Sequence, residues 1–144
     1  MITLLQYFGD KQHSPEQEAA AFDLVCRVNA LREEAESVGI RCNQIDPDTG
    51  TEISGSRGGA GDGGFRLPGA VTGRPKSSHK EARGVDAYDP DNALDEWLDE
   101  YDYDDGQNAM LEKHGLYRES PKATPGWCHL QTRSPASGRR TFNP

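Results

Sequence analysis

The sequence predicts an α+β fold in which a small antiparallel sheet packs against an N-terminal amphipathic helix and further helices. One long stretch near the N-terminus repeats apolar residues at helical spacing. Several later stretches are short and alternate apolar with polar residues, which is typical of half-buried strands. A chain of 144 residues with 33% hydrophobic residues can bury one lean core. Residues 1–144 are therefore expected to form a single domain.

The helix predicted over residues 14–39 carries both a start and a stop signal. Ser14 can cap its N-terminus, Pro15 suits the first helical position, and Gln17 can complete a capping box. Gly39 is well placed to end it. The apolar stripe consists of Ala21, Leu24, Val25, Val28, Leu31, Ala35 and Val38. This stripe is expected to lie on the sheet.

A β-hairpin is predicted next, with strands at 40–45 and 51–54. The intervening Asp-Pro-Asp-Thr-Gly sequence, residues 46–50, is typical of a turn. Its aspartates also suggest a calcium loop, but the twelve-position pattern with a distal Glu is absent, which favours the turn. A glycine-rich segment, residues 55–76, then matches neither a phosphate-binding loop nor a dinucleotide fingerprint. It is expected to be an active-site loop, because long loops in compact domains are usually functional or disordered.

The second half of the chain alternates strand and helix signals. Strands are predicted over 85–89, 116–119 and 127–132, and a short helix over 108–114. Another helix is indicated by apolar residues at helical spacing: Leu94, Trp97, Leu98 and Tyr101. Residues 133–144 form a polar, basic tail.

Composition excludes several classes of partner. The net charge of −8 and a pI near 4.9 argue against nucleic acid and against an anionic membrane surface. The sequence contains no apolar run of the ~20 residues that a spanning helix needs. Residues 1–8 lack the basic region of a signal peptide, so synthesis in the cytoplasm without an export address is expected. Three cysteines without paired spacing favour a reducing compartment.

One set of side chains predicts a metal site. Period-two alternation places Asp86 on the outward face of its strand, and places Trp127, His129 and Gln131 together on one face of another strand. His79 follows the glycine-rich segment directly. Two imidazoles and one carboxylate that leave a fourth position open suit catalytic zinc, whereas structural zinc usually has four mostly sulfur ligands.

The motifs Ser77-x-His79-x₆-Asp86 and Trp127-x-His129, preceded by Ser54-Gly55-Ser56-Arg57, are similar to those of a known family. The chain resembles the hedgehog/D,D-peptidase zinc superfamily of D-alanyl-D-alanine carboxypeptidase-like metallopeptidases, most of all its small phage-encoded members. The match runs from residue 54 to the C-terminus. The resemblance implies an α+β fold, Zn²⁺ on the His/Asp/His set, and hydrolysis of peptidoglycan peptides. It also implies a phage enzyme that acts at the cell wall or is carried in the virion with other virion proteins.

Further roles are expected on this basis. Glu119 is predicted to be the general base, because a strand pair could bring it beside His129. Arg57 is expected to stabilise the oxyanion or hold a substrate carboxylate, while Ser77 and Trp127 line the pocket. The family often places its catalytic Glu three residues before the last His, and that position holds glycine here. The family's Gly and Ala within the first motif are likewise exchanged, as Ala82 and Gly84.

Two alternatives remain open from the sequence. The glycine three residues before the last His is compatible with a non-catalytic, zinc-binding structural or wall-binding component of a phage particle. The acidic stretch over 89–105 could be a calcium-regulated module.

Overall fold

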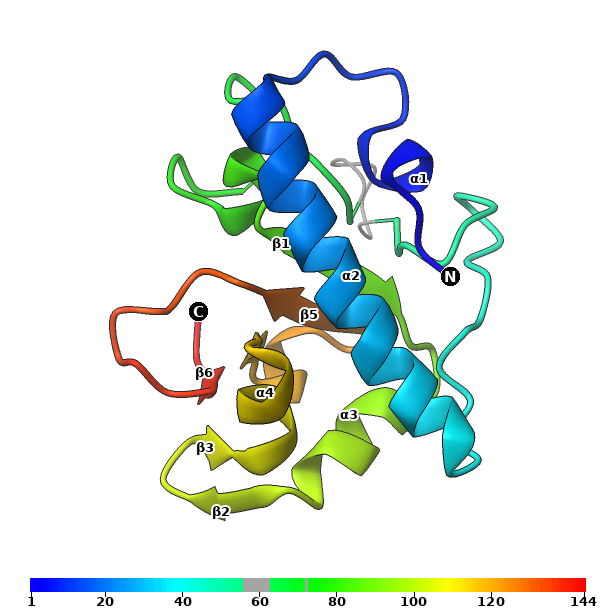
Figure 1. Ribbon diagram of the computed structural model, residues 1–144, viewed down its shortest axis with the longest axis vertical. Helices are drawn as coiled ribbons and strands as arrows, with labels where there is room; N and C mark the ends of the chain where they lie inside the picture. The colour runs from blue at the N-terminus through cyan, green and yellow to red at the C-terminus, as the bar shows by residue number, and fades with distance from the viewer. Residues whose placement is uncertain (56–62, 72) are drawn as a thin grey trace.

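The computed structural model describes residues 1–55, 63–71 and 73–144, and it confirms the α+β fold (Figure 1). The helical elements are α1 (Leu4–Phe8), α2 (Pro15–Ser37), α3 (Ala93–Asp99), α4 (Ala109–His114) and the 3₁₀ turns η1 (Ser78–Glu81) and η2 (Pro121–Ala123). The main sheet contains β1 (Gly84–Tyr88), β4 (Tyr117–Glu119), β5 (Trp127–Gln131) and β6 (Thr141–Phe142). A small ribbon pairs β2 (Asp102–Asp104) with β3 (Gln107–Asn108).

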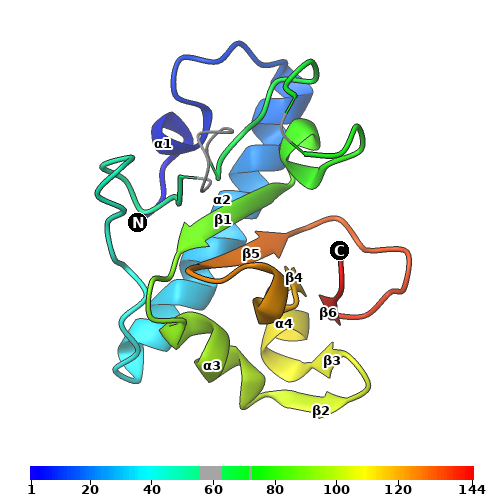
Figure 2. The ribbon, with the colours of Figure 1, turned by 180° about the vertical axis from the view of Figure 1, so that it is seen from behind.

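Helix α2 begins as its capping signals predict. The Gln17 backbone N–H donates to Ser14 Oγ over 3.1 Å, and the Ser14 backbone N–H donates to Gln17 Oε1 over 2.8 Å. The helix ends at Ser37, two residues before Gly39, which has a φ of +91°. Figures 1 and 2 show α2 running along one face of the main sheet. Its predicted stripe is buried there, apart from the exposed Val38 just beyond the helix end.

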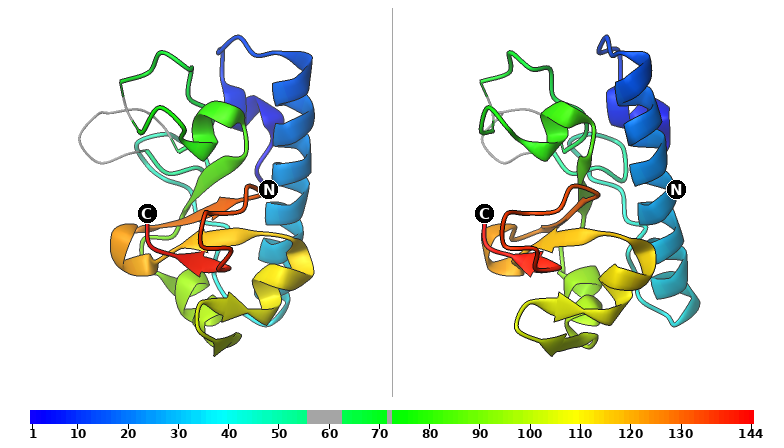
Figure 3. Two further views of the ribbon diagram at one scale, coloured as in Figure 1. Left: turned by 90° about the vertical axis from the view of Figure 1, so that its left-hand side faces the viewer. Right: turned by 60° about the vertical axis from the view of Figure 1, so that its left-hand side comes forward.

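The main sheet has the strand order β1-β5-β4-β6. Strands β1, β5 and β4 pair antiparallel, and in the first of these pairs Asp86 lies opposite His129. Strand β6 pairs parallel with β4 and comes from the tail, in which the sequence predicted no strand. Figure 3 shows the sheet seen more nearly from its edge, with α2 on one side. Asp86 and His129 alternate along their strands with core residues such as Val85 and Cys128, so they lie on the other side of the sheet.

The predicted hairpin at 40–54 is wrong. Residues 40–45 form no strand, and the remainder contributes only isolated bridges, Asp46 with Thr51 and Ile53 with Ala87. Side chains satisfy this backbone instead of a ladder: Glu36 accepts from the backbone N–H groups of Cys42 and Asn43. The turn at 46–50 does form, because its first aspartate accepts from the backbone N–H groups of residues 48 and 55.

The glycine-rich segment is partly built into the core. The Gly63 N–H donates to the Ser54 carbonyl over 2.7 Å, and the Gly63 carbonyl accepts from the Asp86 N–H over 2.8 Å. A Cβ on Gly63 would lie 2.5 Å from the Ser54 carbonyl oxygen, and one on Gly64 would lie 2.4 Å from the Tyr7 carbonyl oxygen. Glycine therefore permits this segment to run at backbone distance from β1 on one side, at Asp86, and from α1 on the other, at Tyr7.

One hydrophobic cluster lies between α2 and the core-facing side of the sheet. Val85, Cys128 and Leu130 contribute from the strands, and each is fully buried. Cys128 thus points away from the outward face, as predicted. Within the described residues, no helix combines the length and apolarity needed to cross a membrane.

Candidate metal centre

His79 is held in place by its own turn and by the glycine-rich segment. It lies in η1, where the His79 backbone N–H donates to Ser77 Oγ over 3.4 Å. Its ring Nδ1 lies 2.9 Å from the Gly64 carbonyl oxygen. Because a carbonyl only accepts, Nδ1 carries the proton, and Nε2 presents a lone pair to the interior of the site.

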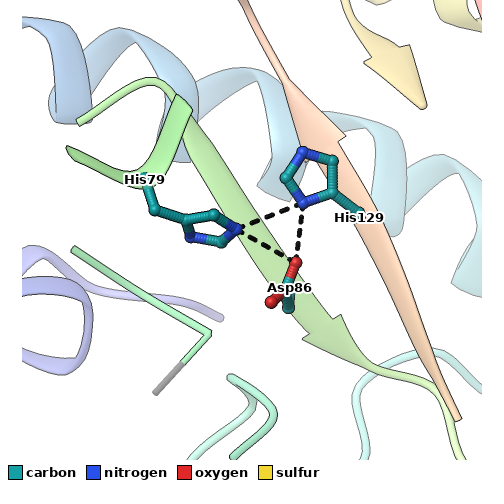
Figure 4. A group of neighbouring side chains, drawn as sticks. All are labelled: His79, Asp86 and His129. Atoms are coloured by element: carbon teal, nitrogen blue, oxygen red, sulfur yellow. Dashed lines mark hydrogen bonds and ion pairs between the residues drawn. The ribbon is translucent and has the colours of Figure 1, made fainter. Parts of the chain in front are cut away.

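Asp86 and His129 face that lone pair from the paired strands β1 and β5 (Figure 4). Asp86 Oδ1 lies 2.7 Å from His129 Nδ1 and 3.3 Å from His79 Nε2. The two imidazole nitrogens lie 3.2 Å apart. The side chains therefore converge on one point from a 3₁₀ turn and two strands.

This convergence fits a metal ion. A tetrahedral ion bound by nitrogen and oxygen at about 2.0–2.2 Å separates its ligand atoms by about 3.3–3.6 Å. Two of the three separations agree within about 0.1 Å, and the shortest would open slightly. All three residues are buried, with 3% to 7% of their surface exposed. Among the described residues they are the one group of three or more His, Cys, Asp or Glu side chains whose ligand atoms lie close enough together to hold a metal ion.

The charges of the three groups reinforce one another. Burial raises the pKa of Asp86, but the charges and hydrogen bonds of His79 and His129 outweigh it and hold this pKa far below its usual range. Burial lowers the pKa of His129, but the hydrogen bond and charge of Asp86 outweigh that effect, so the pKa is raised. A proton and a cation therefore favour the same place beside Asp86.

Arg66 approaches the same carboxylate from the glycine-rich segment. Its Nη2 lies 3.3 Å from Asp86 Oδ2, the oxygen directed away from the histidines. The sequence shows Arg66 as one of three arginines in that segment, and spacing alone cannot select it. The predicted Arg57 lies outside the described residues.

Glu119 reaches the site through strand register. Strands β4 and β5 pair Tyr117 with Gln131 and Arg118 with Leu130, and Glu119 is the next residue of β4, at the end of this pairing. Its negative charge is among the influences that raise the pKa of His129. The structure thus brings the predicted base beside the third predicted ligand.

The cluster opens into a cavity of about 460 Å³. Ser77, Trp127 and Glu119 line it, as the sequence predicted for the first two, and Arg66 lines it as well. Three further basic residues, Arg74, Lys76 and Arg133, stand around it. The tail contributes a wall through Phe142, Asn143 and Pro144, which sequence reasoning did not anticipate. This volume is sufficient for a short peptide segment.

Neither buried cysteine joins the cluster. Cys128 lies on the core side of β5, where burial raises the pKa of its thiol well above the usual value. Burial also raises the pKa of Cys42 to about 12. Both are therefore thiols packed in the core rather than thiolate ligands.

Comparisons of the chain with protein-family models, with curated proteins and with solved structures find no match.

Proposed function

We propose that the protein is a zinc-dependent peptidase that hydrolyses stem or cross-link peptides of bacterial peptidoglycan, as a phage lysis or virion-associated enzyme. The observation that carries the proposal is the convergence of His79, Asp86 and His129 in an open cavity that Glu119 also lines. The motifs similar to those of D-alanyl-D-alanine carboxypeptidase-like metallopeptidases support the choice of reaction.

The donor set favours zinc. Two imidazole nitrogens and one carboxylate oxygen form the three-ligand set of a catalytic zinc site, and no sulfur completes a closed structural one among the described residues. When bound, zinc supplies a water molecule with a pKa near ~7 and polarises the scissile carbonyl.

The chain's own residues account for the remaining steps. Glu119 accepts the proton of the attacking water and returns it to the leaving amine. Arg66 adds positive charge where the carbonyl oxygen develops its negative charge, a role for which Arg57 also remains predicted. Ser77 and Trp127 form walls along the substrate.

The charge around the cavity suits a peptide rich in carboxylates. Arg74, Lys76 and Arg133 gather there although the chain as a whole carries a net charge of −8. Peptidoglycan peptides carry carboxylates beside their D-amino acid bonds, so this local reversal of sign favours their approach.

The test is release of amino groups from purified peptidoglycan, with and without a chelator, by wild type and by Glu119→Gln. We expect chelator to abolish the release, and Glu119→Gln to lower the rate by about 10²–10⁴-fold while metal binding persists. Glu96→Gln, an exposed change on α3, is the matched control and should keep full activity. Full activity in Glu119→Gln would refute the assignment of the base and leave the metal centre standing.

A second candidate is a zinc-binding component of a phage particle that has no catalytic activity. It is favoured by Gly126, which occupies the position of the family's usual catalytic Glu and has a φ of +93° that suits glycine. A purified protein that binds one zinc ion, yet releases no amino groups between pH 5 and 9, would support this candidate over the peptidase.

A further inference from the structure

The outer nitrogen of His129 has its own buried partner. His129 Nδ1 faces Asp86, while Nε2 on the other side of the ring lies 3.0 Å from Gln131 Oε1. Gln131 follows two residues later on the same face of β5. Both residues are 3% exposed, so water cannot readily replace this contact.

The orientation of the Gln131 amide is set by a second bond. Its Nε2 donates to the Arg133 carbonyl oxygen over 2.5 Å, which leaves Oε1 directed at the imidazole. An amide oxygen only accepts, so His129 Nε2 must carry a proton, which leaves Nδ1 as the ring nitrogen that can bind a metal ion at the centre. Ser78 Oγ is a second neighbour of the same nitrogen, but it lies farther away, at 3.4 Å.

The two histidines are therefore held in place by different kinds of hydrogen-bond partner. His79 donates to a backbone carbonyl, that of Gly64, which no side-chain substitution removes. His129 depends on the side chain of Gln131. Partners of this kind orient the ligand and raise its basicity, and their removal typically lowers metal affinity by about 10–100-fold.

We propose that Gln131 is a positioning residue that sets the tautomer and ring orientation of His129 for metal binding. This inference rests on the metal site of the proposed function. Gln131 acts through its amide oxygen, and its bond to the Arg133 carbonyl serves to aim that oxygen.

The experiment compares Zn²⁺ affinity, measured by competition with a chromogenic chelator, in wild type, Gln131→Leu and Gln131→Glu. Leucine has a similar volume and no acceptor, so we expect affinity to fall about 10–100-fold. Glutamate retains the acceptor but loses the bond to the Arg133 carbonyl that aims it, so its affinity should lie between those of Gln131→Leu and wild type. The Co²⁺ absorption spectrum should change more in the leucine variant than in the glutamate variant.

Two further measurements make the outcomes decisive. Thermal melting of the metal-free proteins must show that each variant folds, and Ser78→Ala should weaken binding less than Gln131→Leu because its contact is longer. If folded Gln131→Leu binds Zn²⁺ as wild type does, or if Gln131→Glu binds as weakly as Gln131→Leu, the inference is overturned while the metal site stands. If wild type itself binds no Zn²⁺, both the inference and the proposed function fail.

Discussion

The two faces of the main sheet carry two clusters of ionisable residues with opposite designs. On the outward face, His79, Asp86 and His129 direct their ligand atoms at one another. On the core face, Arg118 points into the interior and is bound by carboxylates. Its Nη1 lies 3.1 Å from Asp95 Oδ1, and its Nη2 lies 2.7 Å from Asp99 Oδ1.

The comparison shows how structural and functional charge differ. Arg118 is completely buried, and its counter-charges come from α3, so this cluster joins the helix to the sheet. The outward cluster instead joins a carboxylate to two groups that are weak bases, beside an open cavity. Metal binding to such a buried ligand set would also stabilise the fold.

The largest expected effect is on the core face. Arg118→Met should lower the free energy of unfolding by about 3–5 kcal/mol, because it leaves Asp95 buried without its cation. Urea denaturation monitored by circular dichroism measures this. Arg139→Met is the control. The ion pair of Arg139 with Asp105 is exposed, so its loss should change the free energy of unfolding by no more than about 0.5 kcal/mol. Equal losses in both variants would contradict the structural role of the buried pair.

The next largest effect is on the outward face. His129→Ala should weaken Zn²⁺ binding by about 10²–10³-fold, because one of three ligands is lost. The metal-free protein should lose much less stability than Arg118→Met does. Chelator competition and thermal melting together measure both quantities. His114→Ala, which removes a histidine paired with Glu34, should retain the affinity of wild type; a comparable loss there would contradict the assignment.

A third prediction uses pH to test the buried Asp95 carboxyl on the core face of the sheet. Burial raises the pKa of Asp95 from 3.8 to about 6, although Arg118 opposes the shift. A raised carboxyl pKa contributes stability that is fully present below the unfolded value and is lost as the pH rises through about 6. The stability of wild type relative to Asp95→Asn should therefore fall by about 2 kcal/mol between pH 4 and pH 7. If the difference in stability between wild type and Asp95→Asn does not change between pH 4 and pH 7, the raised pKa of Asp95 is contradicted.

The smallest expected effect concerns the turn that carries His79. Ala82 has a φ of +57°, in the left-handed region, which costs a residue with a Cβ about 1–2 kcal/mol. Ala82→Gly should raise the free energy of unfolding by about 0.5 kcal/mol, after the greater unfolded-state entropy of glycine is subtracted. Gly84→Ala should lower the free energy of unfolding, because the new Cβ would lie 2.2 Å from Ser78 Oγ. Thermal melting of the two variants checks the direction of each change in stability. A lower melting temperature for Ala82→Gly than for wild type would contradict the backbone strain at Ala82.

Much of the fold follows from local signals that the sequence displays. The capping box of α2, the apolar stripe along it, and the glycine after α4 each depend on residues a few positions apart. Period-two alternation likewise placed Asp86 and His129 on outward faces and Cys128 in the core, because strand geometry leaves no other arrangement. The positions of Asp86 and His129 could be predicted for this reason, whereas His79 was chosen for its place directly after the glycine-rich segment.

Other features were decided only by the tertiary structure. Residues 40–45 have the composition of a strand, but hydrogen bonds to the carboxylate of Glu36 hold part of their backbone away from the sheet. The contact of Arg66 with Asp86 and the parallel pairing of β6 depend on where the chain returns, which no local pattern encodes. Gln131 was placed on the site face by its alternation, yet its role depends on where its amide oxygen points. That direction is set by a bond to the Arg133 carbonyl in the folded chain.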